Sequence, residues 1–204
     1  MYVPPHYRAE GEVLASFIRA AEFGQLVSVT GKGEPWVTHV PVLCEQRGDE
    51  WWVETHLARA NPQGREVDDS PVLVVLPGPG AYVSPAWYTV DEVPTWNYLA
   101  VHLRGRAERL EGEAFRQSLA RLVARHESGR TDGKLLEEYD EDMIAPKLRA
   151  AVGLRIRVER LDGAFKLSQE QETRGRQQVA TALAEQGGEA ARIAAAMHER
   201  ERDD

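Results

Sequence analysis

The segment Ala81–Gly105, AYVSPAWYTVDEVPTWNYLAVHLRG, is the part of the sequence around which the other elements are arranged. It contains two of the five tryptophans and three of the six tyrosines of the chain, together with two prolines. Hydroxyl, amide and imidazole groups lie among these rings, on Ser84, Thr89, Thr95, Asn97 and His102. A planar ligand requires such a flat apolar surface with a few orienting polar groups. The same rings could instead fill a β-rich core, and the composition leaves both interpretations open.

Strand-like runs flank the aromatic segment. Val72–Leu76 is a continuous apolar run that favours a strand buried on both faces, and Gly78-Pro79-Gly80 is expected to end it. After the segment, Tyr98–Arg109 alternates between apolar and polar residues, which is typical of a strand. A further strand is expected at Ala81–Ser84. The segment SPAWYTVDEVPTWN then leads to Tyr98–Arg109 as an unusually long aromatic connection, which fits a function better than a simple link.

The N-terminal part predicts one helix followed by an antiparallel meander. The helix begins near Glu10, and Gly24 is placed to stop it. Turn residues separate the three strand-like runs that follow, which are Leu26–Thr30, Trp36–Cys44 and Trp51–His56. Because side chains alternate along a strand, Thr38 and His39 are expected to point to opposite faces.

The block HLARANP, His56–Pro62, predicts a turn into a short helix. Asn61 is a suitable N-cap and Pro62 a suitable first helical residue. A helix start with Arg59 just before it would attract an anion. An ordinary capped helix with an exposed arginine is the alternative.

The C-terminal half predicts helices and a hairpin. Helices are expected at Gly112–Glu127 and Met143–Val152, and a hairpin at Leu154–Leu167 with Asp162-Gly163 as its turn. Two further alanine-rich helices follow residue 169. We therefore predict a domain over residues 1–168, with inserted helices at about 112–152, and a C-terminal helical arm over residues 169–204. The mixed charges of the arm argue against a helix-turn-helix motif for DNA.

Composition limits the classes of partner. The 204 residues carry a formal net charge of -8, so DNA is a possible partner that the charge does not support. The N-terminal sequence MYVPPHYRAE has no apolar signal region, and no apolar run is long enough to span a membrane. A cytoplasmic location without a membrane partner is expected. Cys44 has no second cysteine to pair with, and its alternating surroundings predict a buried apolar side chain.

Motifs for covalent or metal chemistry are missing from the sequence. It has no glycine-rich phosphate loop, no paired-cysteine pattern and no Gly-x-Ser-x-Gly elbow, so no catalytic residue is assigned. The acidic stretch Leu136–Asp142 lacks the pattern of a calcium loop, and no metal is predicted. His39, His56 and His102 lie in or beside predicted strands and could act as metal or haem ligands, although lone strand histidines are usually core or rim residues.

A phosphorylated aromatic cofactor fits the polar and aromatic residues better. Thr38, His39, Arg59 and the helix start near Asn61 could hold its phosphate. Trp87, Tyr88 and Trp96 could form a wall for its ring, and Ser84, Thr95 and Asn97 could contact the polar edge of the ring.

Seven sequence blocks give a resemblance to a known family. They are MYVPPHY at the N-terminus, THVPVL at Thr38–Leu43, HLARANP at His56–Pro62, YVSPAWY at Tyr82–Tyr88, VPTWNY at Val93–Tyr98, VHLRG at Val101–Gly105 and KLSQ at Lys166–Gln169. In this order the blocks resemble the PaiB-type FMN-binding negative transcriptional regulators, over residues 1 to about 183.

The resemblance implies an α+β, mainly antiparallel fold, namely an FMN-binding split β-barrel of the pyridoxamine-phosphate-oxidase type with peripheral helices. It implies a homodimer with FMN between the subunits, and it places the THV and HLAR blocks, His56 included, at the phosphate. The candidate cofactor-binding residues are Thr38, His39, His56, Arg59, Asn61, Ser84, Trp87, Tyr88, Thr95, Trp96 and Asn97.

Three functions remain in competition at this point. The leading hypothesis is a dimeric FMN-binding regulator of transcription. The second is a flavin-dependent oxidoreductase acting on a small substrate, for which His102 and Tyr88 would be the proton donors to test. The third is a haem-binding split-barrel protein, which depends on the histidines.

Overall fold

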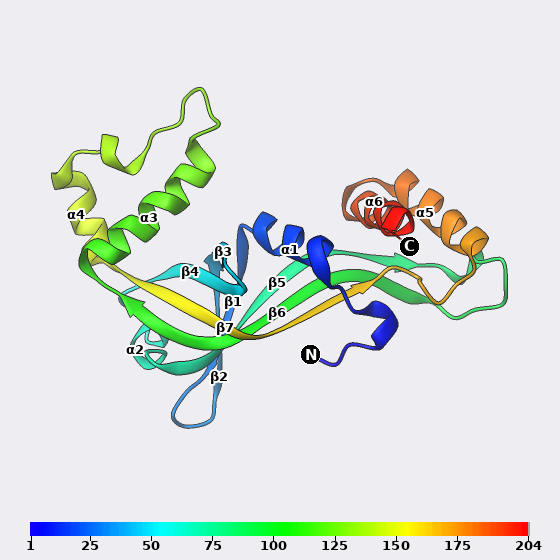
Figure 1. The fold of residues 1–204 in the computed structure, drawn as a ribbon, viewed down its shortest axis with the longest axis horizontal. Coiled ribbons are helices and arrows are strands. Elements are labelled where there is room, and N and C mark those ends of the chain that lie inside the picture. Colours follow the sequence, from blue (N-terminus) through cyan, green and yellow to red (C-terminus); the bar gives the residue numbers. More distant parts are fainter. Residues whose placement is uncertain (204) are drawn as a thin grey trace. The chain divides into compact units, whose positions relative to one another are not determined.

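The computed structural model describes residues 1–203, so the last residue of the predicted C-terminal arm, Asp204, lies outside the described residues. The chain forms two compact units (Figure 1). Unit 1 consists of Met1–Ala15, Pro77–His102 and the chain from Asp162 onward, and unit 2 consists of Ser16–Leu76 and Leu103–Leu161. Helices α5 and α6, expected as a C-terminal arm, belong to unit 1.

The described residues form seven strands and six α-helices, with short 3₁₀ turns between some of them. The strands are β1 (Phe23–Val29), β2 (Pro35–Pro41), β3 (Leu43–Arg47), β4 (Glu50–Ala58), β5 (Ser70–Val83), β6 (Thr95–Leu110) and β7 (Ala151–Lys166). The α-helices are α1 (Gly11–Ala20), α2 (Gln63–Glu66), α3 (Gly112–Glu127), α4 (Glu141–Arg149), α5 (Thr173–Gln186) and α6 (Gly188–Asp203). Short 3₁₀ turns are η1 (Pro5–Tyr7), η2 (Pro85–Trp87) and η3 (Leu136–Glu138).

The seven strands form one sheet in the order β2-β1-β5-β6-β7-β4-β3. In the antiparallel ladder of β1 and β2, Phe23 pairs with Pro41 and Val29 with Pro35. Between β4 and β7, Trp52 pairs with Arg157 and Ala58 with Ala151. The predicted fold class, a mainly antiparallel β-sheet with peripheral helices, is confirmed.

The predicted single strand Trp36–Cys44 is wrong, because the chain breaks at Val42. The backbone N–H of Val42 donates to the carbonyl of Glu22, 2.9 Å away, and β3 then pairs with β4 at the other end of the sheet from β2. The simple meander therefore does not form. Cys44 is buried in β3 as predicted, and burial raises the pKa of its thiol to about 12.

Glycines expected to end elements lie inside strands instead. Gly24 is part of β1, where a Cβ atom would lie 2.8 Å from the carbonyl oxygen of Val75 on β5. Gly78-Pro79-Gly80 does not end β5, which continues to Val83, and the alternate residues Leu73 and Val75 are only partly buried. Gly24 permits the close approach of β5, and the glycines of β5 allow the strand to continue. The local sequence does not indicate either role.

The predicted hairpin at Asp162-Gly163 is also wrong, because β7 runs through it to Lys166. The N-terminal segment packs at this point of unit 1. Ala9 N–H donates to the carbonyl of Gly163 at 3.1 Å, and the N-terminal ammonium pairs with Asp162 at 2.9 Å. A Cβ on Gly163 would lie 2.7 Å from Leu14, so the glycine serves close packing rather than a turn.

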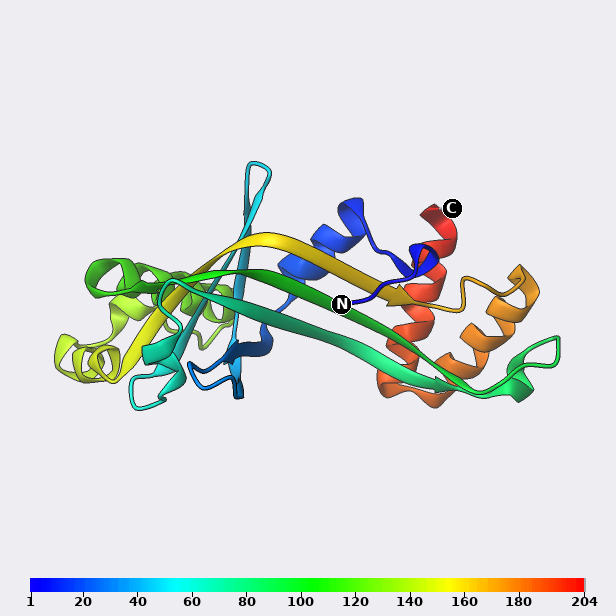
Figure 2. The same ribbon diagram turned by 90° about the horizontal axis from the view of Figure 1, so that it is seen from below.

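Helix α3 has the predicted bounds, whereas α4 ends before the predicted Val152 because β7 begins at Ala151. The two C-terminal helices are confirmed, and α5 packs beside α6 (Figures 1 and 2). Their facing apolar residues, Val179, Leu183, Ile193 and Met197, are buried. Among the helices of the described residues, none combines the length and apolarity that crossing a membrane requires.

Candidate functional site

Two of the predicted phosphate-binding residues, Thr38 and Asn61, meet in a hydrogen-bond network in unit 2. The Thr38 hydroxyl donates to Oε1 of Gln63 at 2.5 Å and accepts from Nδ2 of Asn61 at 3.0 Å. The Gln63 amide, 1% exposed, also donates to the hydroxyl of Ser28 at 3.0 Å and to the Leu26 carbonyl at 3.2 Å. This network holds the THV block of β2 against the turn that carries the HLARANP block.

The network limits what each residue can offer to a ligand. The hydroxyl proton of Thr38 is used by Gln63, whereas Asn61 retains one amide N–H that takes no part in its bond to Thr38. Asn61 Oδ1 accepts from the backbone N–H of Gln63 at 3.0 Å, but the N-cap of α2 is Pro62 rather than the predicted Asn61. Helix α2 spans only Gln63–Glu66, which is too short to provide the N-terminal dipole that the sequence interpretation invoked.

Arg59 lies at the junction of α4 and β7. Its Nε donates to the carbonyl of Arg149 at 2.7 Å, and its Nη2 donates to the carbonyl of Ala151 at 2.8 Å. The backbone N–H of Arg59 donates to the carbonyl of Ala150 at 2.7 Å. Arg59 thus satisfies carbonyl groups at the C-terminal end of α4, where a cation is also favoured by the helix dipole.

A hollow of about 350 Å³ lies beside Arg59 in unit 2. Its walls come from α3, α4 and the residues before them, and its lining includes Glu111, Glu113, Arg116, Leu148 and Arg149. Neither bond made by Arg59 uses the two N–H groups of its Nη1. This arrangement leaves guanidinium donors for an anion in the hollow.

The charges around this hollow support an anion site. Glu113 accepts a hydrogen bond from Gln117 at 3.0 Å, and Glu111 lies 3.7 Å from the guanidinium of Arg109. Neither acid forms an ion pair with Arg59 or Arg149 among the described residues. Two arginines without a carboxylate partner therefore line the same hollow.

The two histidines predicted in unit 2, His39 and His56, do not line the hollow beside Arg59. His39 is exposed on β2, and its ring stacks beside that of Phe23 with 6.4 Å between the ring centroids. Its side chain lies on the face of β2 opposite to Thr38, as predicted. His56 is half-buried 6.4 Å from the ring of Phe115, and burial lowers the pKa of its imidazole. Within the described residues, no group of three or more His, Cys, Asp or Glu side chains could hold a metal ion.

A second polar cluster lies in unit 1, around Ser168 of the KLSQ block. Asn97 is fully buried, and its Nδ2 donates to Oγ of Ser168 at 3.0 Å. The Tyr88 hydroxyl lies 3.3 Å from the same oxygen, and burial raises the pKa of this phenol. Ser168 has a φ of 59°, a left-handed conformation that its contacts with Asn97 and Tyr88 stabilise.

The other predicted ring-binding residues are also in unit 1. The indole of Trp96 is 58% exposed and lies edge-on to Tyr82, with 6.2 Å between ring centroids. The hydroxyl of Thr95 accepts from Nζ of Lys166 at 2.5 Å. Ser84 Oγ accepts from the backbone N–H of Ala86 at 3.3 Å and begins η2, which ends at the half-buried Trp87.

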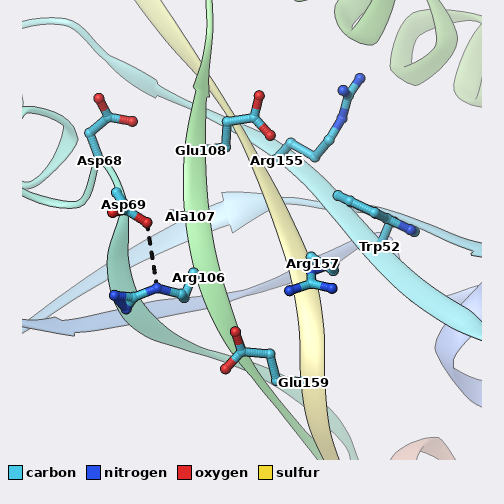
Figure 3. A pocket seen from close by; sticks show the side chains of 9 residues that line it. All are labelled: Trp52, Asp68, Asp69, Arg106, Ala107, Glu108, Arg155, Arg157 and Glu159. Atoms are coloured by element: carbon cyan, nitrogen blue, oxygen red, sulfur yellow. Dashed lines mark ion pairs between the residues drawn. The ribbon is translucent and has the colours of Figure 1, made fainter.

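Another hollow, of about 390 Å³, lies on unit 2 among β4, β6 and β7 (Figure 3). Its three arginines all have carboxylate partners: Arg106 lies 3.4 Å from Asp69, Arg155 lies 2.9 Å from Glu54, and Arg157 lies 3.6 Å from Glu50. Because these charges compensate one another, this surface offers less to a phosphate than the hollow at Arg59.

Sequence reasoning missed three residues of these clusters. Gln63 and Ser168 organise the two hydrogen-bond networks, and Arg149 lines the hollow beside Arg59. Gln63 follows the HLARANP block directly and Ser168 lies within the KLSQ block, so their neighbourhood was a signal that could have been used. Arg149 had no such signal in the sequence.

Comparisons with known proteins agree with this architecture. A family model described as a putative FMN-binding domain matches residues 1–160. Protease synthase and sporulation protein PAI 2 of Bacillus subtilis is 34% identical over 171 residues, covering 83% of this chain and 82% of that protein.

Solved structures show the same fold. The flavocytochrome Anf3 from Azotobacter vinelandii matches with a TM-score of 0.59 at 17% identity, over 78% of this chain and 68% of that one. The FAD and heme binding protein from Mycobacterium smegmatis matches with a TM-score of 0.57 at 18% identity, over 78% of this chain and 73% of that one. The split β-barrel expected from the sequence blocks is thus confirmed, and the chain belongs to the PaiB-type family of FMN-binding domain proteins.

Proposed function

We propose that this protein is a cytoplasmic homodimer that binds FMN and acts as a negative regulator of transcription. The observation that carries the flavin assignment is the hollow beside Arg59, in which two guanidinium groups have no carboxylate partner within the part of the chain that the structure describes. A phosphate monoester is a dianion near neutral pH and prefers charge-assisted hydrogen bonds from arginine. Membership of an FMN-binding family makes the phosphate of FMN the suitable occupant.

The residues present fit FMN in their chemistry. Arg59 and Arg149 would hold the phosphate in the hollow that they line. Asn61 is not among the lining residues, and Thr38 and Gln63 hold it in a separate hydrogen-bond network. Within unit 1, the exposed ring of Trp96 and the partly exposed rings of Trp87 and Tyr88 are proposed separately as surface suited to a planar aromatic ring. FMN supplies reversible uptake of electrons when it is bound, and the protein binds and orients it.

The homodimer is supported by apolar surface in unit 1. Tyr82, Trp96 and Tyr98 are 46%, 58% and 37% exposed and come from neighbouring strands β5 and β6. Exposed aromatic surface of this kind usually meets a partner, and a second copy of the chain would bury it. The relative in Bacillus subtilis is called a protease synthase and sporulation protein, and a role in controlling expression would suit that description.

Regulation of transcription is proposed to act without strong direct binding to DNA. The chain carries a net charge of -8, and charge of this sign repels the phosphate backbone. A partner protein or a small molecule would then connect the flavin protein to its target gene.

One set of measurements tests this function. Titration of the flavin-free chain with FMN should shift the flavin absorption bands to saturation at one FMN per chain, and light scattering at micromolar concentration should give the mass of a dimer. A chain that takes up no FMN would contradict the flavin assignment. A monomeric mass would contradict the dimer, and tight, sequence-specific binding in a DNA mobility assay would contradict indirect regulation.

Arg59→Ala is expected to weaken FMN binding by about 1.5–3 kcal/mol, because it removes a charge-assisted contact with the phosphate. Riboflavin lacks the phosphate, so its affinity should change little. The measurement is a fluorescence titration of both flavins. Arg65→Ala, in the exposed part of α2, is the matched control and should leave both affinities unchanged. If both flavins lose affinity equally, Arg59 acts only through the α4–β7 junction.

A further inference from the structure

Unit 2 contains a third cavity, larger than the two hollows described above, which faces another side of α4 than the hollow at Arg59. It has a volume of about 490 Å³ and lies under α3, η3 and α4, against His56 of β4. Met143, Ile144 and Lys147 of α4 line it, whereas Ala145, Leu148 and Arg149 of the same helix line the hollow at Arg59. The two spaces therefore face different sides of α4 and are separate sites.

The wall of this cavity is mainly apolar. Its lining includes Leu119, Leu122, Val123, Leu136 and Ile144, and its volume falls within the usual range for small-molecule sites. His56 contributes a half-buried imidazole, and neither of its ring nitrogens has a hydrogen-bond partner among the described residues. The ring nitrogens of His56 are therefore available for a hydrogen bond with a ligand in the cavity.

Two lysines, Lys134 and Lys147, are among the lining residues of the cavity. The ammonium group of Lys134 lies 4.2 Å from the centre of the Tyr139 ring, which also lines the cavity, and makes a cation–π contact with it. In the part of the chain that the structure describes, neither Lys134 nor Lys147 pairs with a carboxylate. The one acid of the lining, Glu127, accepts from the backbone N–H of Lys134 at 3.1 Å and lies 3.9 Å from Arg130. Its charge is thus already compensated.

We propose that the cavity under α3 and α4 binds a small molecule with an apolar, ring-sized body and a single carboxylate. The apolar wall would take up the body, the two lysines would attract the carboxylate, and His56 would donate or accept one hydrogen bond. Charge complementarity selects an anion over a neutral or cationic ligand of the same shape. The assignment does not depend on FMN, because the residues that line the two sites differ.

The test uses two probes of equal shape, 1-naphthoate and 1-naphthalenemethanol, which differ in the carboxylate. Calorimetric titration of the full chain, with and without saturating FMN, should show one naphthoate site per chain and weaker binding of the alcohol. Lys134→Gln with Lys147→Gln should weaken naphthoate binding at least about fivefold and leave the alcohol unchanged, because only the anion loses its charged partners. Lys32→Gln, in the exposed turn after β1, is the control and should bind naphthoate as the unaltered chain does.

A cavity-filling variant locates the binding. Leu119→Trp places a large ring in the lined space and should weaken both probes at least about tenfold if they occupy it. Unchanged binding in this variant would overturn the location, and equal binding of both probes with no effect of the lysine variants would overturn the ligand class. If Leu119→Trp does not fold, the exposed lysine variants still decide the proposal. Failure to bind FMN in the same titrations would concern only the proposed flavin function.

Discussion

Glu54→Ala is expected to lower the free energy of unfolding by about 3–5 kcal/mol, because it removes a buried carboxylate at the centre of an arginine cluster. The Glu54 side chain is 2% exposed. One of its oxygens lies 2.9 Å from Nε of Arg155 and 3.4 Å from Nη2 of Arg47, and the other accepts from Arg121 of α3. Without Glu54, Arg155 would keep no carboxylate partner among residues whose side chains the structure describes.

The cluster joins four elements of unit 2. Glu54 lies on β4, and its partners come from β3, α3 and β7. Glu50→Ala on the same strand is the matched control, since Glu50 is 54% exposed and its pair with Arg157 spans 3.6 Å. Exposed pairs of this kind contribute at most about 1 kcal/mol. Urea denaturation of both variants measures the difference, and equal losses would contradict a special role for the buried carboxylate.

The same carboxylate makes stability depend on pH. Burial alone would raise the pKa of Glu54, but hydrogen bonds from Ser118 and Arg155 and the charges of Arg121 and Arg155 outweigh it and lower the pKa. A carboxyl with a lowered pKa in the folded state stabilises the fold above its ordinary pKa of about 4.3 and loses this contribution as the pH falls further. The stability gap between the unaltered chain and Glu54→Gln should therefore narrow below about pH 4.3.

The periodic elements could be predicted from the sequence, and the ends of strands could not. Helix α3 and the two C-terminal helices follow from apolar spacing alone, because their buried stripe repeats with the period of a helix. Gly24 and Gly163 indicate turns locally, yet both lie inside strands because other segments approach them closely. Such long-range contacts, from β5 and from the N-terminal segment, leave no mark on the local pattern.

The sequence indicates candidate residues for the site, but it does not indicate how they are arranged in space. The blocks identify Thr38, Asn61 and Arg59, and the fold bonds the first two to each other while it places Arg59 at the end of α4. His56 was grouped with them because it lies in the same block. Side chains alternate along β4, so the ring of His56 lies toward Phe115 and the cavity under α3. The neighbouring Thr55 lies on the other face, where its hydroxyl donates to the Pro41 carbonyl.

Gly105→Ala is expected to lower the free energy of unfolding by at least about 3 kcal/mol, above the range typical of overpacked cores, because the clash is with backbone. Gly105 lies on β6 in the VHLRG block, and a Cβ atom there would overlap the backbone carbonyl oxygen of Arg157 on β7. A clashing side chain could rotate away, but the backbone of a paired strand cannot. Strands β6 and β7 would have to move apart, which would break hydrogen bonds between them.

Gly80→Ala on β5 is the matched control. The nearest atoms to its added Cβ, the Asn97 carbonyl oxygen and Tyr98 Cβ, lie 3.8 Å away, which is ordinary van der Waals contact. Replacing glycine by alanine at a position without strain restricts the unfolded chain, so this variant should be unchanged or more stable by about 0.4–1 kcal/mol. Thermal and urea unfolding should therefore show a large loss of stability for Gly105→Ala and no loss for Gly80→Ala. Equal changes in the free energy of unfolding would mean that the spacing of β6 and β7 adapts to the added methyl group. The close approach of the two strands would then not explain the glycine of the VHLRG block.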